Sequence, residues 1–351
     1  MEIHDTMRSG GRASEARRVA ESVREAGLAH GPETAAHLYQ DALTLLGDRE
    51  HTPLHSDVMR WYGTALRDAG QTSGAEPLYW RSLKIAQRLE YTRGAAHALN
   101  CLAGLAQRRG EIGLATQMLA DAAVLAYTCN EARLLTMIHA NLGVLADISG
   151  DLSSALSHYE YALGASEGVS DVQEVSWVLI NYGALLGSRG QTSDADRAFT
   201  RGLSIARARG DAVAEALLEE NRAELRMMRG ELDDAYACIT RVFEIAERRH
   251  DNARLAAALK LRGAYERLSG RTEDAAHTLR HGLTLAAVTE DALLGGEMLY
   301  QFGLALHEDR NETMARQAWG AALDTFERIT ATDWVTRVRE RLSFGSTGRY
   351  L

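Results

Sequence analysis

A glycine recurs every 40 residues along most of this 351-residue chain. The series is Gly70, Gly110, Gly150, Gly190, Gly230 and Gly270, and Arg310 takes the next place. An alanine follows each of these positions by five residues, and a bulky apolar residue follows four residues later, as in Ala155 and Tyr159. A fixed period of this length is typical of a chain that repeats one supersecondary unit.

Each mark in the period has a role in a pair of helices. Glycine takes the left-handed conformation that ends a helix. Apolar residues at three- and four-residue spacing, such as Leu179, Tyr182 and Leu186, give the first helix one buried stripe. An aspartate at a third register can cap the following helix, and it recurs as Asp171, Asp211, Asp251 and Asp291. Such a hairpin buries both faces only by stacking on its neighbours, which predicts a solenoid.

The composition agrees with helices and excludes several other classes of protein. The chain is 46% hydrophobic and contains only three prolines, and its net charge of −9 argues against general nucleic-acid binding. Cys101, Cys129 and Cys238 are odd in number and lack CxxC spacing, so we predict neither a disulfide framework nor a zinc site. No leader or membrane-length apolar run is present, so we expect a cytoplasmic protein without a membrane partner.

These patterns predict an all-α, right-handed α-solenoid of eight helix-turn-helix repeats. We expect a flexible N-terminus at 1–12, the repeats at 13–330, a capping helix at 331–343 and a flexible tail at 344–351. The first repeat would open with a helix around residues 14–29. Asp333 is expected to cap the last helix.

One repeat carries a recognisable family signature. Asn141, Leu142 and Gly143, followed by Gly150, Ala155, Tyr159 and Ala162, resemble the tetratricopeptide (TPR) pattern. The 40-residue unit is similar to the TPRs of Pins/LGN-type adaptors, kinesin light chains and MalT-type bacterial regulators. The resemblance implies that the first helix of each pair lines a concave groove.

The candidate peptide-binding residues follow from that register. Asn141, Asn181 and Asn221 resemble an amide ladder that would grip a peptide backbone, since an amide offers both a donor and an acceptor. The apolar pockets beside it would be formed by Met137, Val144, Trp177, Ile180 and Leu217. The polar ends of the groove would be formed by Arg60, Asn100, Arg108, Glu220, Glu224 and Tyr300.

Structural roles for the same residues remain open. Asparagine at the ladder register can bond neighbouring helices, and Trp177 can be ordinary core between repeats. One repeat also breaks the apolar pattern, because Glu219 and Arg222 stand where apolar residues are expected. We favour a structural salt-bridge cluster there, with a ligand-contact or subunit role second.

The sequence therefore predicts a scaffold that binds a peptide or partner segment in its groove. The end faces of the array could also pair two copies as a homodimer. The alternative is a MalT-like regulatory module that binds a small molecule or signal peptide to control a partner or transcription. No P-loop, dinucleotide-binding or HExxH motif occurs. We accordingly expect no enzyme, no metal and no cofactor. An enzyme on a helical frame, using groups such as His97 and Glu224, is a third and weaker alternative.

Overall fold

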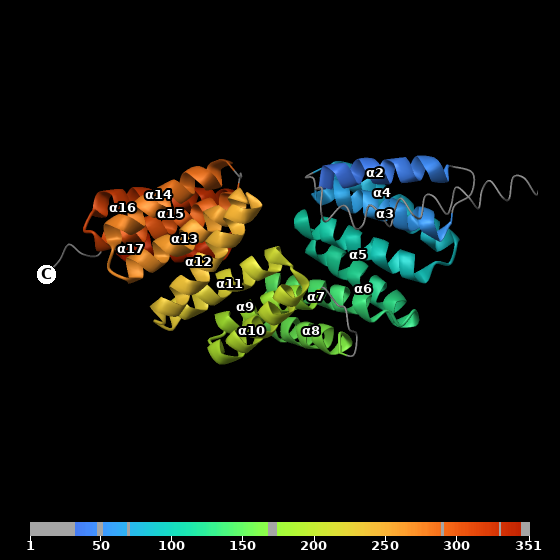
Figure 1. Ribbon diagram of the computed structural model, residues 1–351, viewed down its shortest axis with the longest axis horizontal. Helices are drawn as coiled ribbons and strands as arrows, with labels where there is room; N and C mark the ends of the chain where they lie inside the picture. Colours follow the sequence, from blue (N-terminus) through green and yellow to red (C-terminus); the bar gives the residue numbers. More distant parts are fainter. Residues whose placement is uncertain are drawn as a thin grey trace, which may run out of the picture. The chain divides into compact units, whose positions relative to one another are not determined.

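The computed structural model describes residues 32–47, 52–68, 71–167, 174–288, 291–329 and 331–344. These ranges form sixteen helices and contain no strand (Figure 1). The helices are α2 (Pro32–Leu46), α3 (Pro53–Asp68), α4 (Thr72–Arg88), α5 (Thr92–Arg108), α6 (Ile112–Thr128), α7 (Ala132–Ile148), α8 (Leu152–Ala165), α9 (Glu174–Ser188), α10 (Thr192–Arg209), α11 (Ala212–Met228), α12 (Leu232–Arg249), α13 (Asn252–Leu268), α14 (Thr272–Val288), α15 (Ala292–Glu308), α16 (Glu312–Arg328) and α17 (Thr332–Phe344). The predicted segments 1–12 and 14–29 lie outside the described residues, as does the predicted tail 344–351 except residue 344, which ends α17.

Consecutive helices pack as hairpins, as the period predicts. The pairs α5 with α6, α7 with α8, α13 with α14 and α15 with α16 are each in extensive contact. Gly110, Gly150, Gly190, Gly230 and Gly270 all have φ between 74° and 76°, and Arg310 takes the same left-handed conformation at φ 60°. The all-α solenoid class is therefore confirmed, and the period corresponds to one hairpin.

The aspartate register caps helices where the structure describes it. Asp211, Asp251 and Asp291 each accept a hydrogen bond from the backbone N–H three residues on, at 2.9–3.0 Å. Asp171 lies outside the described residues. The prediction for Asp333 is wrong, because α17 begins one residue earlier and Asp333 lies in its first turn. In the first turn, its negative carboxylate still interacts favourably with the positive end of the helix dipole.

The two helices of a hairpin approach closely where a side chain is missing. A Cβ on Gly143 of α7 would lie 2.6 Å from the Tyr159 ring of α8, and one on Gly303 of α15 would lie 2.3 Å from the Trp319 ring of α16. Tyr159 and Trp319 are almost completely buried. In these two hairpins the bulky residue of the period therefore fills the space left by a glycine on the partner helix.

The chain divides into two compact units. Unit 1 comprises residues 1–178 and unit 2 comprises residues 179–351, and the boundary falls inside α9. The core of unit 1 is centred on α4–α7, with Tyr79, Leu102, Leu119 and Ile138 fully buried. At the end of unit 2, Phe326, Trp319 and Val338 bury α17 against α15 and α16. Within the described ranges, no helix has the length and apolarity needed to cross a membrane.

Candidate functional site

The predicted binding residues lie on the first helices of the hairpins, which we call the A helices (α3, α5, α7, α9, α11, α13 and α15). In unit 1, Nδ2 of Asn141 on α7 donates to Oδ1 of Asn100 on α5 at 2.9 Å. Met137 and Val144 are half-buried one turn away on either side of Asn141. This part of the A-helix surface therefore combines amide groups with apolar side chains.

A histidine surrounded by arginines lies next to this pair. Burial first, and the charges of Arg60, Arg93 and Arg133 second, lower the pKa of His97 to about 3. Arg60 pairs with Asp57 at 3.2 Å. His97 is therefore neutral at physiological pH and is poorly matched to general acid or base catalysis there. This removes a key group from the enzyme alternative.

Helix α9 carries three more of the predicted residues. The Trp177 side chain is 40% exposed, so it offers apolar surface to solvent rather than filling the core. Ile180 is buried at 7% exposure and contributes little surface. Asn181 is half-buried, and among the described residues its amide has no hydrogen-bond partner. Arg108, at the last turn of α5, is exposed.

In unit 2 the A helices carry charges that are mutually paired. Glu220 accepts from Arg254 at 3.0 Å, and Lys260 lies 3.1 Å from Glu224 and 2.7 Å from Glu297. Burial opposes the charge on Lys260, but these two carboxylates outweigh burial and raise its pKa. Burial also opposes the charge on Glu220, and here it outweighs the effect of Arg254 and raises the pKa of the carboxyl.

The remaining predicted residues of unit 2 flank this charged network. The Asn221 amide donates to the carbonyl of Leu217 in its own helix at 2.8 Å, and the Leu217 side chain is half-buried. Tyr300 is 6% exposed. The two carboxylates predicted at this polar end of the groove, Glu220 and Glu224, are thus paired with basic side chains within the fold.

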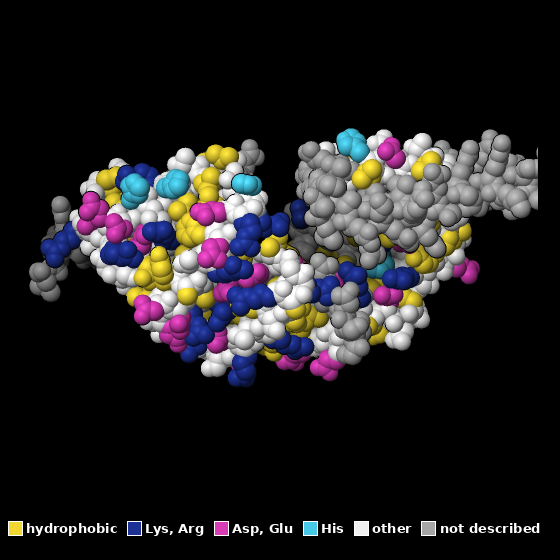
Figure 2. Space-filling view, in the orientation of Figure 1, with side chains coloured by type: hydrophobic (Ala, Val, Ile, Leu, Met, Phe, Trp, Pro, Cys, Tyr) yellow, Lys and Arg dark blue, Asp and Glu magenta, His cyan; other side chains and the backbone are white. Residues whose placement is uncertain are grey.

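The break in the apolar pattern is an ionic face along α11. It comprises Glu215, Glu219, Arg222 and Arg226, spaced as one side of a helix. Arg207 of α10 donates to Glu215 at 2.9 Å and to Glu219 at 2.6 Å, and Arg241 of α12 donates to Glu215 at 3.0 Å. Figure 2 shows basic and acidic side chains intermixed over the surface of unit 2. We call the four α11 residues, together with Arg207 and Arg241, the ionic seam.

Residues of the ionic seam line an open pocket of about 510 Å³. Four arginines line it, namely Arg207, Arg222, Arg226 and Arg241. Each of them pairs with at least one carboxylate, as Arg226 does with Asp196 at 3.0 Å. Burial and the nearby Glu219 raise the pKa of Cys238, at the same pocket, to about 12, so its thiol is unreactive. The arginines of this pocket are therefore already neutralised by carboxylates of the fold.

Two polar residues at the ladder register escaped the sequence analysis. Continuing the 40-residue spacing from Asn221 leads through Leu261 to Gln301 and Arg341. Oε1 of Gln301 is buried without a hydrogen-bond partner in the described part of the chain. The period itself was the signal, but Leu261 interrupts the series of amides. Over the described ranges, no group of three or more His, Cys, Asp or Glu residues is placed to hold a metal ion.

Known structures share this fold. Aspartyl phosphate phosphatase F from Bacillus subtilis is 13% identical with a TM-score of 0.63, and the match covers 90% of this chain and 93% of that one. A Rap protein complexed with Competence and Sporulation Factor is 12% identical with a TM-score of 0.59, covering 94% and 97%. A chain of the APC/C hetero-tetramer Cut9-Hcn1 is 13% identical with a TM-score of 0.61, and the match covers 88% of this chain and 52% of that one.

The chain has the TPR-like fold of these proteins. Its repeated helical hairpins and these structural neighbours confirm the predicted TPR resemblance. No protein-family model matches the sequence, and no curated protein matches it. The predicted likeness to one TPR family over another stays a prediction.

Proposed function

We propose that this chain is a protein-interaction module that binds an extended segment of a partner protein along its A helices. The observation that carries the proposal is the Asn100–Asn141 pair. The hydrogen bond between them uses one donor and one acceptor. In the described residues, Oδ1 of the half-buried Asn141 has no hydrogen-bond partner, so it still presents an acceptor to a peptide backbone, while Asn100 is only 6% exposed and serves to orient that amide.

Apolar surface beside the amides supports the same proposal. Met137 and Val144 flank Asn141 in unit 1, Trp177 is 40% exposed on α9, and Leu217 lies one turn before Asn221 in unit 2. Amides that hold a backbone and apolar side chains that receive alternate side chains are the two parts of sequence-selective peptide binding. Because Glu220, Glu224 and Lys260 are paired within the fold, these three charges play a minor part in recognition.

The regulatory form of this function also has support. A Rap protein of the same fold, matched over nearly its whole length, is complexed with Competence and Sporulation Factor. By analogy of fold, this chain would bind a signalling factor on the same A helices. Binding of such a factor to the purified chain, with an affinity that depends on Asn141, would support this regulatory function.

The test is selection of binding peptides from a random-peptide library with the full chain as bait, followed by affinity measurements on the selected peptides. Asn141→Ala removes an amide from the proposed surface, and we expect affinity to fall about 3- to 10-fold for each lost hydrogen bond. Gln117→Ala is the control, because Gln117 is an exposed amide on the second-helix α6. Equal affinities for Asn141→Ala and the original chain, with its thermal stability unchanged, would overturn the proposal.

A further inference from the structure

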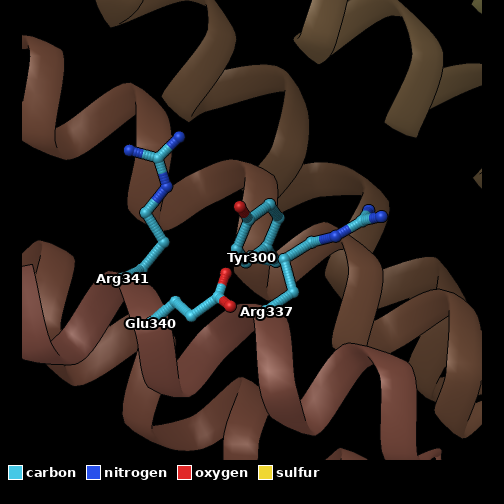
Figure 3. Close-up of a pocket in the computed structure, with 4 residues that line it drawn as sticks. All are labelled: Tyr300, Arg337, Glu340 and Arg341. Carbon is cyan, nitrogen blue, oxygen red and sulfur yellow. The ribbon is translucent and has the colours of Figure 1, made fainter.

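The last helix forms an open pocket with the last A helix. The pocket has a volume of about 490 Å³ and is lined by Tyr300 of α15 and by Arg337, Glu340 and Arg341 of α17. Figure 3 shows Tyr300 between the two arginine side chains, with the Glu340 carboxylate beside it. Arg337 and Arg341 are four residues apart, so they share one face of the helix. The lining carries one positive charge in excess.

Tyr300 is held as a fixed floor for this pocket. Its ring meets Trp334 edge-on at 5.4 Å, and its backbone carbonyl accepts from Nε1 of Trp319 at 3.2 Å. Tyr300 is only 6% exposed, yet among the described residues its hydroxyl has no hydrogen-bond partner. The hydroxyl is therefore a donor at a defined position in the pocket.

The arginines of α17 differ in a way that points to a ligand. Arg339, which does not line the pocket, pairs with Glu327 of α16 at 2.6 Å. Arg337 and Arg341 have no ion pair in the described part of the chain, although Arg337 stacks on Trp334 at 4.6 Å. Two like charges one turn apart repel each other, and a bound anion would relieve that repulsion.

The comparison with the ionic seam sharpens this difference. The four arginines that line the pocket of the ionic seam all have carboxylate partners within the fold. An anion entering there would compete with those partners. At the α17 pocket it would compete only with water and with Glu340, which leaves the guanidinium groups available.

We propose that the pocket of Tyr300, Arg337 and Arg341 binds an anionic group, a carboxylate or a phosphate, of a bound molecule. Arg341 and Arg337 are exposed and lie on opposite sides of the Tyr300 ring (Figure 3), so their side chains would turn toward the anion to donate to its oxygens, and the Tyr300 hydroxyl would donate a third hydrogen bond. The inference goes beyond the proposed function, because the pocket lies wholly in unit 2, between α15 and α17, and its chemistry does not depend on the amide pair of unit 1.

The test uses small probes on the full chain, followed by ligand-observed NMR titration. The probes are inorganic phosphate, acetyl-glycyl-glycine with a free carboxylate, and the amide of that peptide. We expect saturable binding of the carboxylate, the phosphate or both in the millimolar range, and no binding of the amide. Binding of the carboxylate alone or the phosphate alone would support the proposal and assign the ligand class.

Three variants make the result specific. We expect Arg341→Gln to weaken binding at least fivefold and Tyr300→Phe about threefold, because each removes a donor. Arg339→Gln, on the same helix, should leave the affinity unchanged within about twofold. No saturable binding, equal binding of the amide, or an equal loss in Arg339→Gln would overturn the inference. Because these probes lack an extended peptide segment, failure here is distinct from failure of the Asn141 test.

Discussion

Helices α7 and α11 occupy the same place in their repeats but present different surfaces to their neighbours. Leu135, His139, Leu142 and Ala146 of α7 lie at the register that Glu215, Glu219, Arg222 and Arg226 occupy on α11, 80 residues later. In unit 1 this face is apolar apart from His139, and we call it the apolar seam. In unit 2 the face is the ionic seam. One hairpin geometry is thus compatible with two different kinds of packing.

The two seams differ in how the folded state is stabilised. Apolar packing gains from burial and loses stability roughly with the volume removed. Buried ion pairs repay their desolvation only when each charge keeps its partners, and they are commonly no better than apolar residues of similar size. Glu219 is 4% exposed and has arginine partners on two sides, so its charge depends on both. The predictions below separate these two behaviours.

The largest effect is expected in the apolar seam. Leu135 is 7% exposed, and we expect Leu135→Ala to lower the stability of unit 1 by about 2–4 kcal/mol through loss of burial and a residual cavity. Hydrogen exchange of the α7 and α8 amides measures it locally. Val124→Ala on α6 is the control, since Val124 is 63% exposed and should change exchange little. Similar effects from both substitutions would contradict this account of the seam.

A smaller loss is expected when one charge is removed from the ionic seam. Glu219→Ala leaves Arg207 and Arg222 without a shared carboxylate, and we expect a loss of about 2–3 kcal/mol. This value is reduced because Arg207 is 51% exposed and can turn to water. Hydrogen exchange of α11 and α12 is the measurement, with Glu244→Ala as the control because Glu244 is 52% exposed.

A double substitution tests whether the seam needs its charges at all. Glu219→Leu combined with Arg222→Leu removes both charges and restores the apolar pattern of α7. We expect its stability to lie within about 1 kcal/mol of the original chain, well above that of Glu219→Ala. A double variant as unstable as Glu219→Ala would show that the ion pairs, and not merely the absence of unpaired charge, hold the seam.

Lowering the pH should reduce the stability of unit 1 more than that of unit 2. Burial, and then His158, lower the pKa of His139 from 6.5 to about 4. Between these values the unfolded chain binds a proton that the folded chain does not, so the stability that His139 contributes is complete above 6.5 and falls as the pH drops toward 4. We expect His139 alone to cost unit 1 about 2 kcal/mol at about pH 5, and His97, whose pKa is lowered to about 3, to add to that loss.

The ionic seam should hold through that range of pH. Burial favours the neutral acid at Glu215, but hydrogen bonds from Arg241 and Arg207 outweigh burial and lower its pKa below the ordinary 4.5. Its contribution is therefore lost only as the pH falls below that value. Exchange measured near pH 7 and near pH 5 should show lost protection in α7 and α8 but not in α11 and α12. Substituting the exposed His277 by Gln should change nothing, whereas His139→Asn should reduce the pH dependence.

Salt should have the smallest effect. Raising NaCl from about 0.1 M to about 1 M screens the partly exposed pairs of Arg207 and Arg241, and we expect unit 2 to lose less than about 1 kcal/mol. The apolar seam of unit 1 should be unaffected or slightly strengthened. Hydrogen exchange in both units, compared between the two salt concentrations, is the measurement. A larger loss in unit 1 would reverse the assignment of the two seams.

Periodicity predicted the fold because each mark has a local cause. The left-handed turn at Gly150 and the cap at Asp251 depend on residues within a few positions. The ionic seam was visible as an anomaly at Glu219 and Arg222. Its network was not, because Arg207 and Arg241 belong to other helices and their reach depends on how those helices pack.

The candidate site was less predictable than the fold. Register placed Asn141 and Asn221 correctly on A helices, but it could not show that one amide bonds Asn100 and the other bonds its own helix. The charges expected at the ends of the surface are paired across helices, as Lys260 is with Glu297. The pocket at Tyr300 depends on where α17 docks, which no repeat in the sequence specifies.

The glycine that faces a bulky residue in hairpins such as α7–α8 has a consequence for the evolution of such chains. Because the Tyr159 ring occupies the volume that a Gly143 side chain would need, the spacing of a hairpin is defined inside that hairpin. A 40-residue cassette therefore carries its own hairpin spacing with it when it is duplicated. Substitutions can accumulate on the exposed surfaces while that internal spacing is kept.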